Sequence, residues 1–244
     1  MQNKLISIGE AAEKLGVSVK TLRRWDAAGN LPSTRSGPKG HRYYKEIDLN
    51  LFLRNESALA EQWAMVSVGV IPLNEVYCPT RDVFQARLEK LQHLFQGVVS
   101  DQARYLLCAV AGEIGNNSYD HNLGNWPDIT GIYFAYDISN RQIVLADRGQ
   151  GILKTLKRAR PQLASASEAL KVAFTETVSG RMPEARGNGL KFVRKVIIEN
   201  PFTLKFQTGD AEIFLKEGDS DIITFPSEGD IRGCLAIIGF ENKI

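Results

Sequence analysis

The sequence predicts an α+β protein made of two domains. Residues 1–54 are basic and contain two short capped helical segments followed by a turn-rich hairpin. Residues 79–244 combine amphipathic and buried helical segments with runs of alternating apolar residues, which is typical of helices packed with a sheet. Residues 55–78 give weaker signals, and we expect them to be a linker that becomes part of the edge of the second domain.

The charge of the chain is divided unevenly between these parts. The net charge is +2, but residues 1–54 contain ten basic and five acidic side chains, so this segment carries +5 and the remainder −3. A basic module joined to a mildly acidic body suggests that the two domains have different partners.

Cysteine usage and hydropathy indicate the compartment. Cys78, Cys108 and Cys234 are far apart and form no CxxC pair, which argues against a disulfide framework or a zinc site. With neither a signal peptide nor an apolar run long enough to span a bilayer, we expect a cytoplasmic protein without a membrane partner.

Two short helices are predicted near the start of the chain. Ser7 is a suitable N-cap, and Glu10 three residues later completes a capping box. A glycine-containing turn follows, and Ser18 can cap a second helix over Val19–Ala28. Two such helices make a helix-turn-helix, in which the second helix buries Leu22 and Trp25 and exposes Lys20, Thr21, Arg23 and Arg24.

The next segment has the character of a wing. Residues 33–44 form a turn-rich hairpin with basic and aromatic side chains, and Asp48–Leu53 is expected to be a closing helix. A solvated charged hairpin would not explain this combination of basic and aromatic residues.

Four runs in this module have a specific spacing: Ile8-Gly9-Glu10-Ala11-Ala12, Gly16-Val17-Ser18, Thr21-Leu22-Arg23-Arg24-Trp25 and Gly40-His41-Arg42-Tyr43-Tyr44. Together they resemble the winged helix-turn-helix of the MerR family over about residues 5–54. The resemblance implies double-stranded DNA as a partner, with the second helix in the major groove and the wing on phosphates, through Lys20, Thr21, Arg23, Arg24, Lys39, His41, Arg42 and Tyr43. Such modules can also be protein-binding or excisionase-like, and MerR-like modules commonly act as homodimers.

The middle of the chain contains one clear helix. We expect a short helix over 58–64 and a strand over 66–70 that ends before Pro72. Pro79–Phe95 is amphipathic and either packs on the core or forms a dimer seam. His93 on this helix lacks the acidic residue and proline that follow a phosphate-accepting histidine, so a histidine autokinase is not expected.

A column of polar side chains marks the next helix, which Ser100 can cap and which runs to about Asn122. Glu113, Asn117 and His121 fall at i, i+4 and i+8, so they lie on one face. The preceding residues are apolar, and a polar column on a buried helix needs partners. The pattern is equally compatible with an ordinary solvated face.

Two glycine-containing loops follow. Strands over 129–138 and 142–146 lead to Asp147-Arg148-Gly149-Gln150-Gly151, where glycines let the backbone approach a ligand held by the carboxylate. Arg186-Gly187-Asn188-Gly189 leads into a helix over 190–199, as a phosphate cradle would. The insert at 152–186 has the length of a lid. Short strands over 202–206, 211–215, 221–225 and 233–240 are expected to complete the sheet.

Three motifs thus occur in a fixed order: Glu113-x-x-x-Asn117-x-x-x-His121, Asp147-x-Gly149-x-Gly151 and Gly187-x-Gly189-Leu190. They resemble the N box and the glycine boxes of the GHKL ATPases, the superfamily of gyrase B, MutL, heat-shock protein 90 and the histidine kinases, over about residues 79–240. The resemblance implies a two-layer α/β sandwich that binds ATP and Mg²⁺ between helices and lid.

The same resemblance implies roles for individual residues. Glu113 would be the general base, Asn117 the Mg²⁺ ligand, and Asp147 the acceptor for the adenine amino group. His121 would reach the phosphates, and the pocket would be shaped by Gly149, Gly151, Gly187, Gly189 and Leu190. Lys191 stands where many relatives have glycine, so it either adds a phosphate contact or tightens the pocket.

Three functions are compatible with these patterns. The first is a DNA-associated or transcriptional regulator switched by ATP binding or hydrolysis. The second is a kinase of the anti-sigma type, in which Glu113 activates a hydroxyl of a small protein partner. The third is an adaptor whose nucleotide-binding fold has no catalytic activity.

Overall fold

The computed structural model describes residues 4–27, 29–36, 40–53, 55–176 and 188–241. Contacts divide the chain into two units, Met1–Leu59 and Ala60–Ile244, a boundary five residues after the end proposed from the sequence for the first domain.

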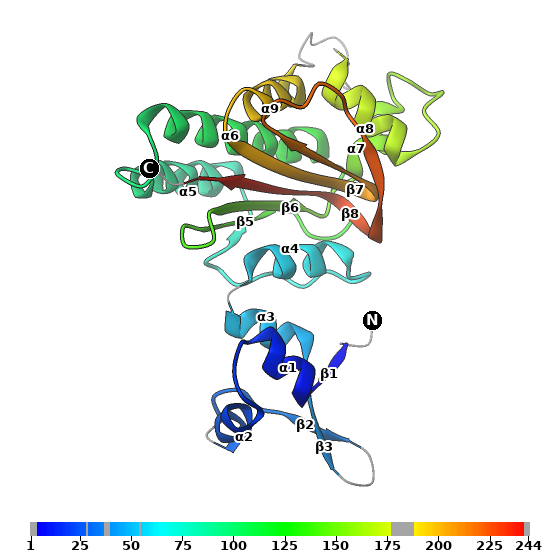
Figure 1. Ribbon diagram of the computed structural model, residues 1–244. Coiled ribbons are helices and arrows are strands. Elements are labelled where there is room, and N and C mark those ends of the chain that lie inside the picture. Colours follow the sequence, from blue (N-terminus) through cyan, green and yellow to red (C-terminus); the bar gives the residue numbers. More distant parts are fainter. Residues whose placement is uncertain (1–3, 28, 37–39, 54, 177–187, 242–244) are drawn as a thin grey trace. The chain divides into compact units, whose positions relative to one another are not determined.

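The first unit is a small helix-turn-helix with a three-stranded antiparallel sheet in the order β1-β3-β2 (Figure 1). Its elements are β1 (Leu5–Ser7), α1 (Ile8–Lys14), α2 (Val19–Ala27), β2 (Thr34–Ser36), β3 (His41–Lys45) and α3 (Glu46–Leu53). The capping box is confirmed, because the Ser7 amide donates to Glu10 over 2.9 Å and the Glu10 amide to Ser7 over 3.4 Å. Leu22, Tyr44 and Leu49 are fully buried at its centre.

The second unit is built on a five-stranded antiparallel sheet in the order β4-β5-β6-β8-β7. Its strands are β4 (Tyr77–Cys78), β5 (Ile132–Asp137), β6 (Gln142–Asp147), β7 (Phe202–Lys216) and β8 (Thr224–Phe240). Its helices are α5 (Arg81–Leu94), α6 (Asp101–Asn122), α7 (Gly151–Leu156), α8 (Ala166–Thr175) and α9 (Gly189–Ile198), which all lie over one face of the sheet (Figure 1). This confirms the α+β class and the two-layer sandwich.

The core lies between the sheet and this helical layer. Alternate residues of β5 and β6 face the helices, including Phe134 and Ile143. Helix α6 packs closely against α5 because α6 has a glycine, Gly115, at the contact. A Cβ on Gly115 would lie 2.3 Å from Cζ of Phe84 on α5.

Helix α5 uses its apolar stripe inside the domain. Phe84 and Leu91 are both 0% exposed and belong to the core. The stripe therefore cannot be a dimer seam, because the sheet and α6 already cover it. Of the two uses that the sequence left open for this helix, core packing is correct.

Helix α4 (Glu56–Met65) contributes to the opposite face of the sheet through its second half. The Trp63 ring lies 6.1 Å from the Tyr133 ring on β5, and Glu61 pairs with Lys205 on β7 over 3.9 Å. The helix expected over 58–64 is thus present and slightly longer.

Two predictions about strands were wrong. Residues 66–70 form no strand; the Trp63 indole donates to the Val70 carbonyl over 2.8 Å, so the chain turns back after α4. The edge strand is instead β4. The four short C-terminal strands are two long ones, because β7 continues through irregularities at Thr208, Gly209 and Ala211, which interrupt its alternation but not its pairing with β8.

Candidate functional site

A cavity of about 570 Å³ lies in the second unit against the face of α6 that carries the polar column. Its size falls in the range of small-molecule sites, which is about 300–1,000 Å³. The structure brings together at this cavity seven of the residues selected from the sequence: Glu113, Asn117, His121, Asp147, Gly151, Gly189 and Leu190. Gly149 and Lys191 are not among its lining residues, and Gly187 lies outside the described residues.

Asp147 forms one end of the cavity. It is the last residue of β6, is 2% exposed, and accepts hydrogen bonds from the Ser118 hydroxyl and the Gly149 amide, both over 2.8 Å. Burial raises the pKa of Asp147 to about 6, although these hydrogen bonds act to lower it. A buried carboxylate on a cavity wall has further lone pairs that can accept from a ligand N–H group.

The loop after Asp147 requires glycine for steric reasons. A Cβ on Gly149 would lie 2.0 Å from Nδ2 of Asn122, and Gly151 begins α7 with a φ of +73°. Asn122 accepts from the Gln150 amide over 2.8 Å and donates to the Ser118 carbonyl over 2.8 Å. The side chain of Asn122 therefore occupies the space that a Cβ on Gly149 would need, and its hydrogen bond to the Gln150 amide holds the loop in place.

Glu113 and Asn117 form the other end of the cavity, at the first residue of α9. A Cβ on Gly189 would lie 1.8 Å from Oε1 of Glu113 and 3.1 Å from Nδ2 of Asn117, so a side chain there would displace the Glu113 carboxylate. Because the N-terminus of a helix carries partial positive charge, this end of the cavity is suited to an anion. Ser118, which contacts Asp147, lies five residues along α6 from Glu113, a rise of about 7 Å.

Part of the cavity wall is apolar. Ile114, Ile152 and Phe206 line it and are each at most 9% exposed. At its rim, Arg81 pairs with Asp120. Such a wall suits a flat apolar ring, while the polar groups stand at the two ends.

Several residues of the site were not selected from the sequence. Ser118 and Asn122 hold Asp147 and its loop, and Thr208 on β7 accepts from the Ile152 amide over 3.2 Å and donates to the Gly233 carbonyl over 2.8 Å. Ser118 and Asn122 stand at i and i+4 on α6, one position beyond the predicted column. That spacing was the available signal, whereas Thr208 had none because its contacts are long-range.

The residues predicted to contact DNA differ in exposure. Lys20, Arg23 and Arg24 on α2 and His41 on β3 are exposed, while Thr21, Arg42 and Tyr43 are half-buried. Lys39 lies outside the described residues.

Arg42 has a partner within the first unit. Its Nε lies 2.6 Å from Oδ2 of Asp26, and Asp26 also accepts from the Ser33 amide over 2.8 Å. The hydrogen bonds from Arg42 and Ser33 lower the pKa of Asp26 to about 2. This pair attaches the wing strand β3 to the end of α2.

The described part of the chain has neither a membrane-spanning helix nor a cluster of metal-ligating side chains. None of its helices is both long and apolar enough to cross a membrane. Across the same residues, His, Cys, Asp and Glu side chains nowhere gather in threes as a metal site would require.

Comparison with known proteins identifies the N-terminal motif. Residues 7–44 match the model of the MerR family regulatory protein, so the helix-turn-helix is of the MerR type. The chain is also 41% identical over 63 residues to the type II methyltransferase M.Eco47II of Escherichia coli; the alignment covers 26% of this chain and 15% of the methyltransferase.

A solved structure is similar to a larger part of the chain. The crystal structure of the 43K ATPase domain of Thermus thermophilus gyrase B, in complex with an aminocoumarin, matches with a TM-score of 0.34 and 16% identity. The match covers 63% of this chain and 38% of the other. Because this likeness is weak, no property of gyrase B is carried over from it.

Proposed function

We propose that this protein is a DNA-binding regulator whose second domain, spanning about residues 79–244, is a GHKL-type domain that binds ATP with Mg²⁺. The observation that carries the proposal is the cavity with the buried Asp147 at one end and Glu113 and Asn117 at the other. The three motifs that line or shape this cavity come from separate parts of the sequence, in the order found in GHKL ATPases.

The Asp147 end fits an adenine ring. The carboxylate accepts from the exocyclic amino group, and the apolar side chains of Ile114, Ile152 and Phe206 pack beside the ring. Ser118 and Asn122 hold the carboxylate and its loop in position, so ligand binding costs little conformational entropy in this loop.

The Glu113 end fits the phosphates. The amide oxygen of Asn117 is a suitable ligand for Mg²⁺, which prefers oxygen donors. His121 and the N-terminus of α9 would interact with the negative charge of the phosphates. When bound, Mg²⁺ neutralises charge on the phosphates. Glu113 orients the attacking water and accepts its proton, which makes the domain an ATPase.

The helix-turn-helix supplies the DNA contacts. Helix α2 enters the major groove, and Lys20, Arg23 and Arg24 contact phosphates and base edges, together with Thr21. The wing contacts phosphates through Lys39, His41 and Tyr43, while Arg42 holds the wing against α2 through Asp26. We place the protein in the cytoplasm and expect it to act on DNA as a homodimer.

Replacing Arg23 and Arg24 together by alanine is expected to weaken duplex binding by tenfold or more. Two lost phosphate contacts should also reduce the slope of log affinity against log salt by about 1 to 2. Alanine is a strong helix former, so α2 should persist. The measurement is a salt series of duplex titrations with the full chain.

The matched control for this prediction removes two exposed positive charges from the second unit, with Lys90→Ala and Lys171→Ala. The control should bind duplex as the wild type does. Equal loss in both double variants would show that total charge, rather than α2, determines binding.

Release of ADP from Mg·ATP by the purified chain, with and without duplex DNA, tests the two domains together. Turnover is expected, at a rate that changes when duplex is added, because a nucleotide switch requires different ATP affinity in the two states. A chain that neither turns over nor binds ATP would contradict the ATPase assignment. A turnover rate that is the same with and without saturating duplex would contradict the switch.

A further inference from the structure

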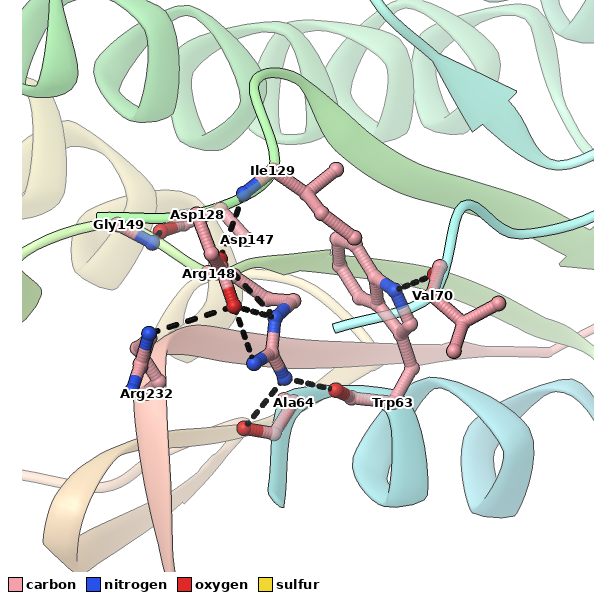
Figure 2. A network of polar contacts seen from close by, with 9 residues as sticks. All are labelled: Trp63, Ala64, Val70, Asp128, Ile129, Asp147, Arg148, Gly149 and Arg232. Atoms are coloured by element: carbon pink, nitrogen blue, oxygen red, sulfur yellow. Dashed lines mark hydrogen bonds and ion pairs between the residues drawn. The ribbon is translucent and has the colours of Figure 1, made fainter. Parts of the chain in front are cut away.

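Arg148 is a fully buried arginine between two residues of the candidate nucleotide site. Asp147 precedes it and Gly149 follows it, and its own exposure is 0%. Arg148 follows directly after β6, and its side chain contacts α4, on the other side of the sheet from the cavity that Asp147 lines. Figure 2 shows it on the opposite side of the sheet from the helical layer, toward the end of α4.

The guanidinium of Arg148 binds a carboxylate and the end of a helix at once. Its Nη2 lies 2.6 Å and its Nε 3.0 Å from Oδ2 of Asp128. Its Nη1 donates to the Trp63 carbonyl and, over 3.4 Å, to the Ala64 carbonyl. The last carbonyls of a helix have no partner within the helix and carry partial negative charge, so Arg148 caps the C-terminus of α4.

Other residues pack around this network (Figure 2). Arg232 on β8 lies 3.3 Å from Oδ2 of Asp128. The Trp63 ring lies 5.8 Å from the Arg148 guanidinium carbon, and a Cβ on Gly69 would be only 2.6 Å from Arg148 Nε. Arg148 therefore has little room to adopt another rotamer while α4 stays in place.

Helix α4 is the segment by which the chain passes from the first unit to the second. It spans Glu56–Met65, and the boundary between the units falls inside it, after Leu59. The C-terminus of this connecting helix is thus attached to the residue that follows Asp147. Asp147 and Arg148 are joined by a peptide bond, so a displacement of the Asp147 backbone also displaces Arg148.

We propose that Arg148 couples nucleotide binding to DNA binding, by transmitting the position of the Asp147 loop to the C-terminus of α4. This inference rests on the proposed function and adds to it the residue through which the regulation acts. This coupling requires nucleotide at Asp147 and DNA at α2 each to bias the same contact, the cap between Arg148 and α4. By thermodynamic linkage, each ligand changes the affinity for the other by the same factor.

The test is the coupling ratio, the duplex Kd without nucleotide divided by the Kd with saturating Mg·ATP. In the wild type it should differ from 1 in either direction, by a factor in the usual range of about 5 to 150. In Arg148→Lys it should fall to within about twofold of 1, because lysine keeps the charge but lacks the fork that binds Asp128 and α4 together. Each ligand alone should still bind this variant.

Two further variants make the result specific. Asp128→Asn removes the carboxylate that orients Arg148, leaves Arg148 in place, and should also bring the coupling ratio close to 1. This variant provides the test if Arg148→Lys does not fold. Arg104→Lys is the matched control, because Arg104 pairs with Asp101 in the first turn of α6 over 3.0 Å and neither residue lines the cavity. It should keep the wild-type ratio.

Hydrogen exchange of the full chain separates failure of this inference from failure of the proposed function. Mg·ATP should slow amide exchange in a peptide covering residues 60–71 of the wild type but not of Arg148→Lys. If ATP binds in an Asp147-dependent way but exchange there is unchanged, or if Arg148→Lys keeps the wild-type coupling ratio, the inference is wrong while the nucleotide site stands. If ATP does not bind the wild type, both are wrong.

Discussion

Replacing Asp147 by asparagine is expected to abolish adenine nucleotide binding and, at neutral pH, to make the protein more stable. An amide in this position presents N–H groups where the carboxylate accepts, so we expect a loss of affinity of about 100-fold or more. The fold should tolerate the change. The asparagine oxygen can accept from the Gly149 amide, and its NH₂ group can donate to the Ser118 hydroxyl, which rotates.

The gain in stability follows from the pKa of Asp147. The folded-state pKa is raised to about 6 from an ordinary value of 3.8, so the folded state favours the protonated carboxyl. Ionisation therefore costs stability as pH rises from about 4 through 6, and the cost is fully present above pH 6. A shift of about 2 pKa units corresponds to about 3 kcal/mol.

Denaturant unfolding of wild type and Asp147→Asn at pH 7.5 and pH 4.5 measures this effect. The variant should be more stable at pH 7.5 by up to about 3 kcal/mol, and its advantage should largely disappear at pH 4.5, where the wild-type carboxyl is protonated. A variant that is less stable at pH 7.5, or that still binds nucleotide as the wild type does, would contradict the role of Asp147.

Glu113→Gln is expected to separate binding from turnover. Loss of a general base typically reduces the rate about 10²- to 10⁴-fold, whereas the isosteric amide still fills the space against Gly189. Nucleotide affinity should change by less than about threefold, since the contact is made in the transition state rather than in the ground state. Single-turnover ADP release and equilibrium binding measure the two quantities separately.

Glu89→Gln provides the control for this change, because Glu89 is exposed on α5 and is not among the cavity-lining residues. It should leave both quantities unaltered. If Glu113→Gln turns over within tenfold of the wild type, Glu113 is not the general base.

Local patterns in the sequence predicted most of the elements. Ser7 and Glu10 marked the start of α1, and Ser100 caps α6 as expected, since its hydroxyl accepts from the Ala103 amide over 3.1 Å. Glu113, Asn117 and His121 were placed on one helical face by spacing alone, and the structure brings them to one cavity. Such features depend on residues within one or two helical turns, which a sequence displays directly.

The missed features depend on contacts between distant segments. Arg148 was noted only as a position between Asp147 and Gly149, yet it binds Asp128 and the end of α4. Arg42 was predicted as a DNA contact, but its pairing with Asp26 joins the wing to α2. Neither could be predicted, because a charged side chain has the same local pattern whether its partner is solvent, a ligand or a distant carboxylate.

Equilibrium titration of the full chain with a fluorescent ADP analogue and Mg²⁺ at pH 7.5 measures whether the cavity binds adenine nucleotides. We predict that the analogue binds saturably, and that ATP and ADP displace it about 100-fold more effectively than GTP does. Guanine carries an acceptor oxygen where adenine carries its amino group, so it would face the Asp147 carboxylate. No saturable binding, or displacement by GTP as effective as by ATP, would contradict adenine nucleotide binding at this cavity.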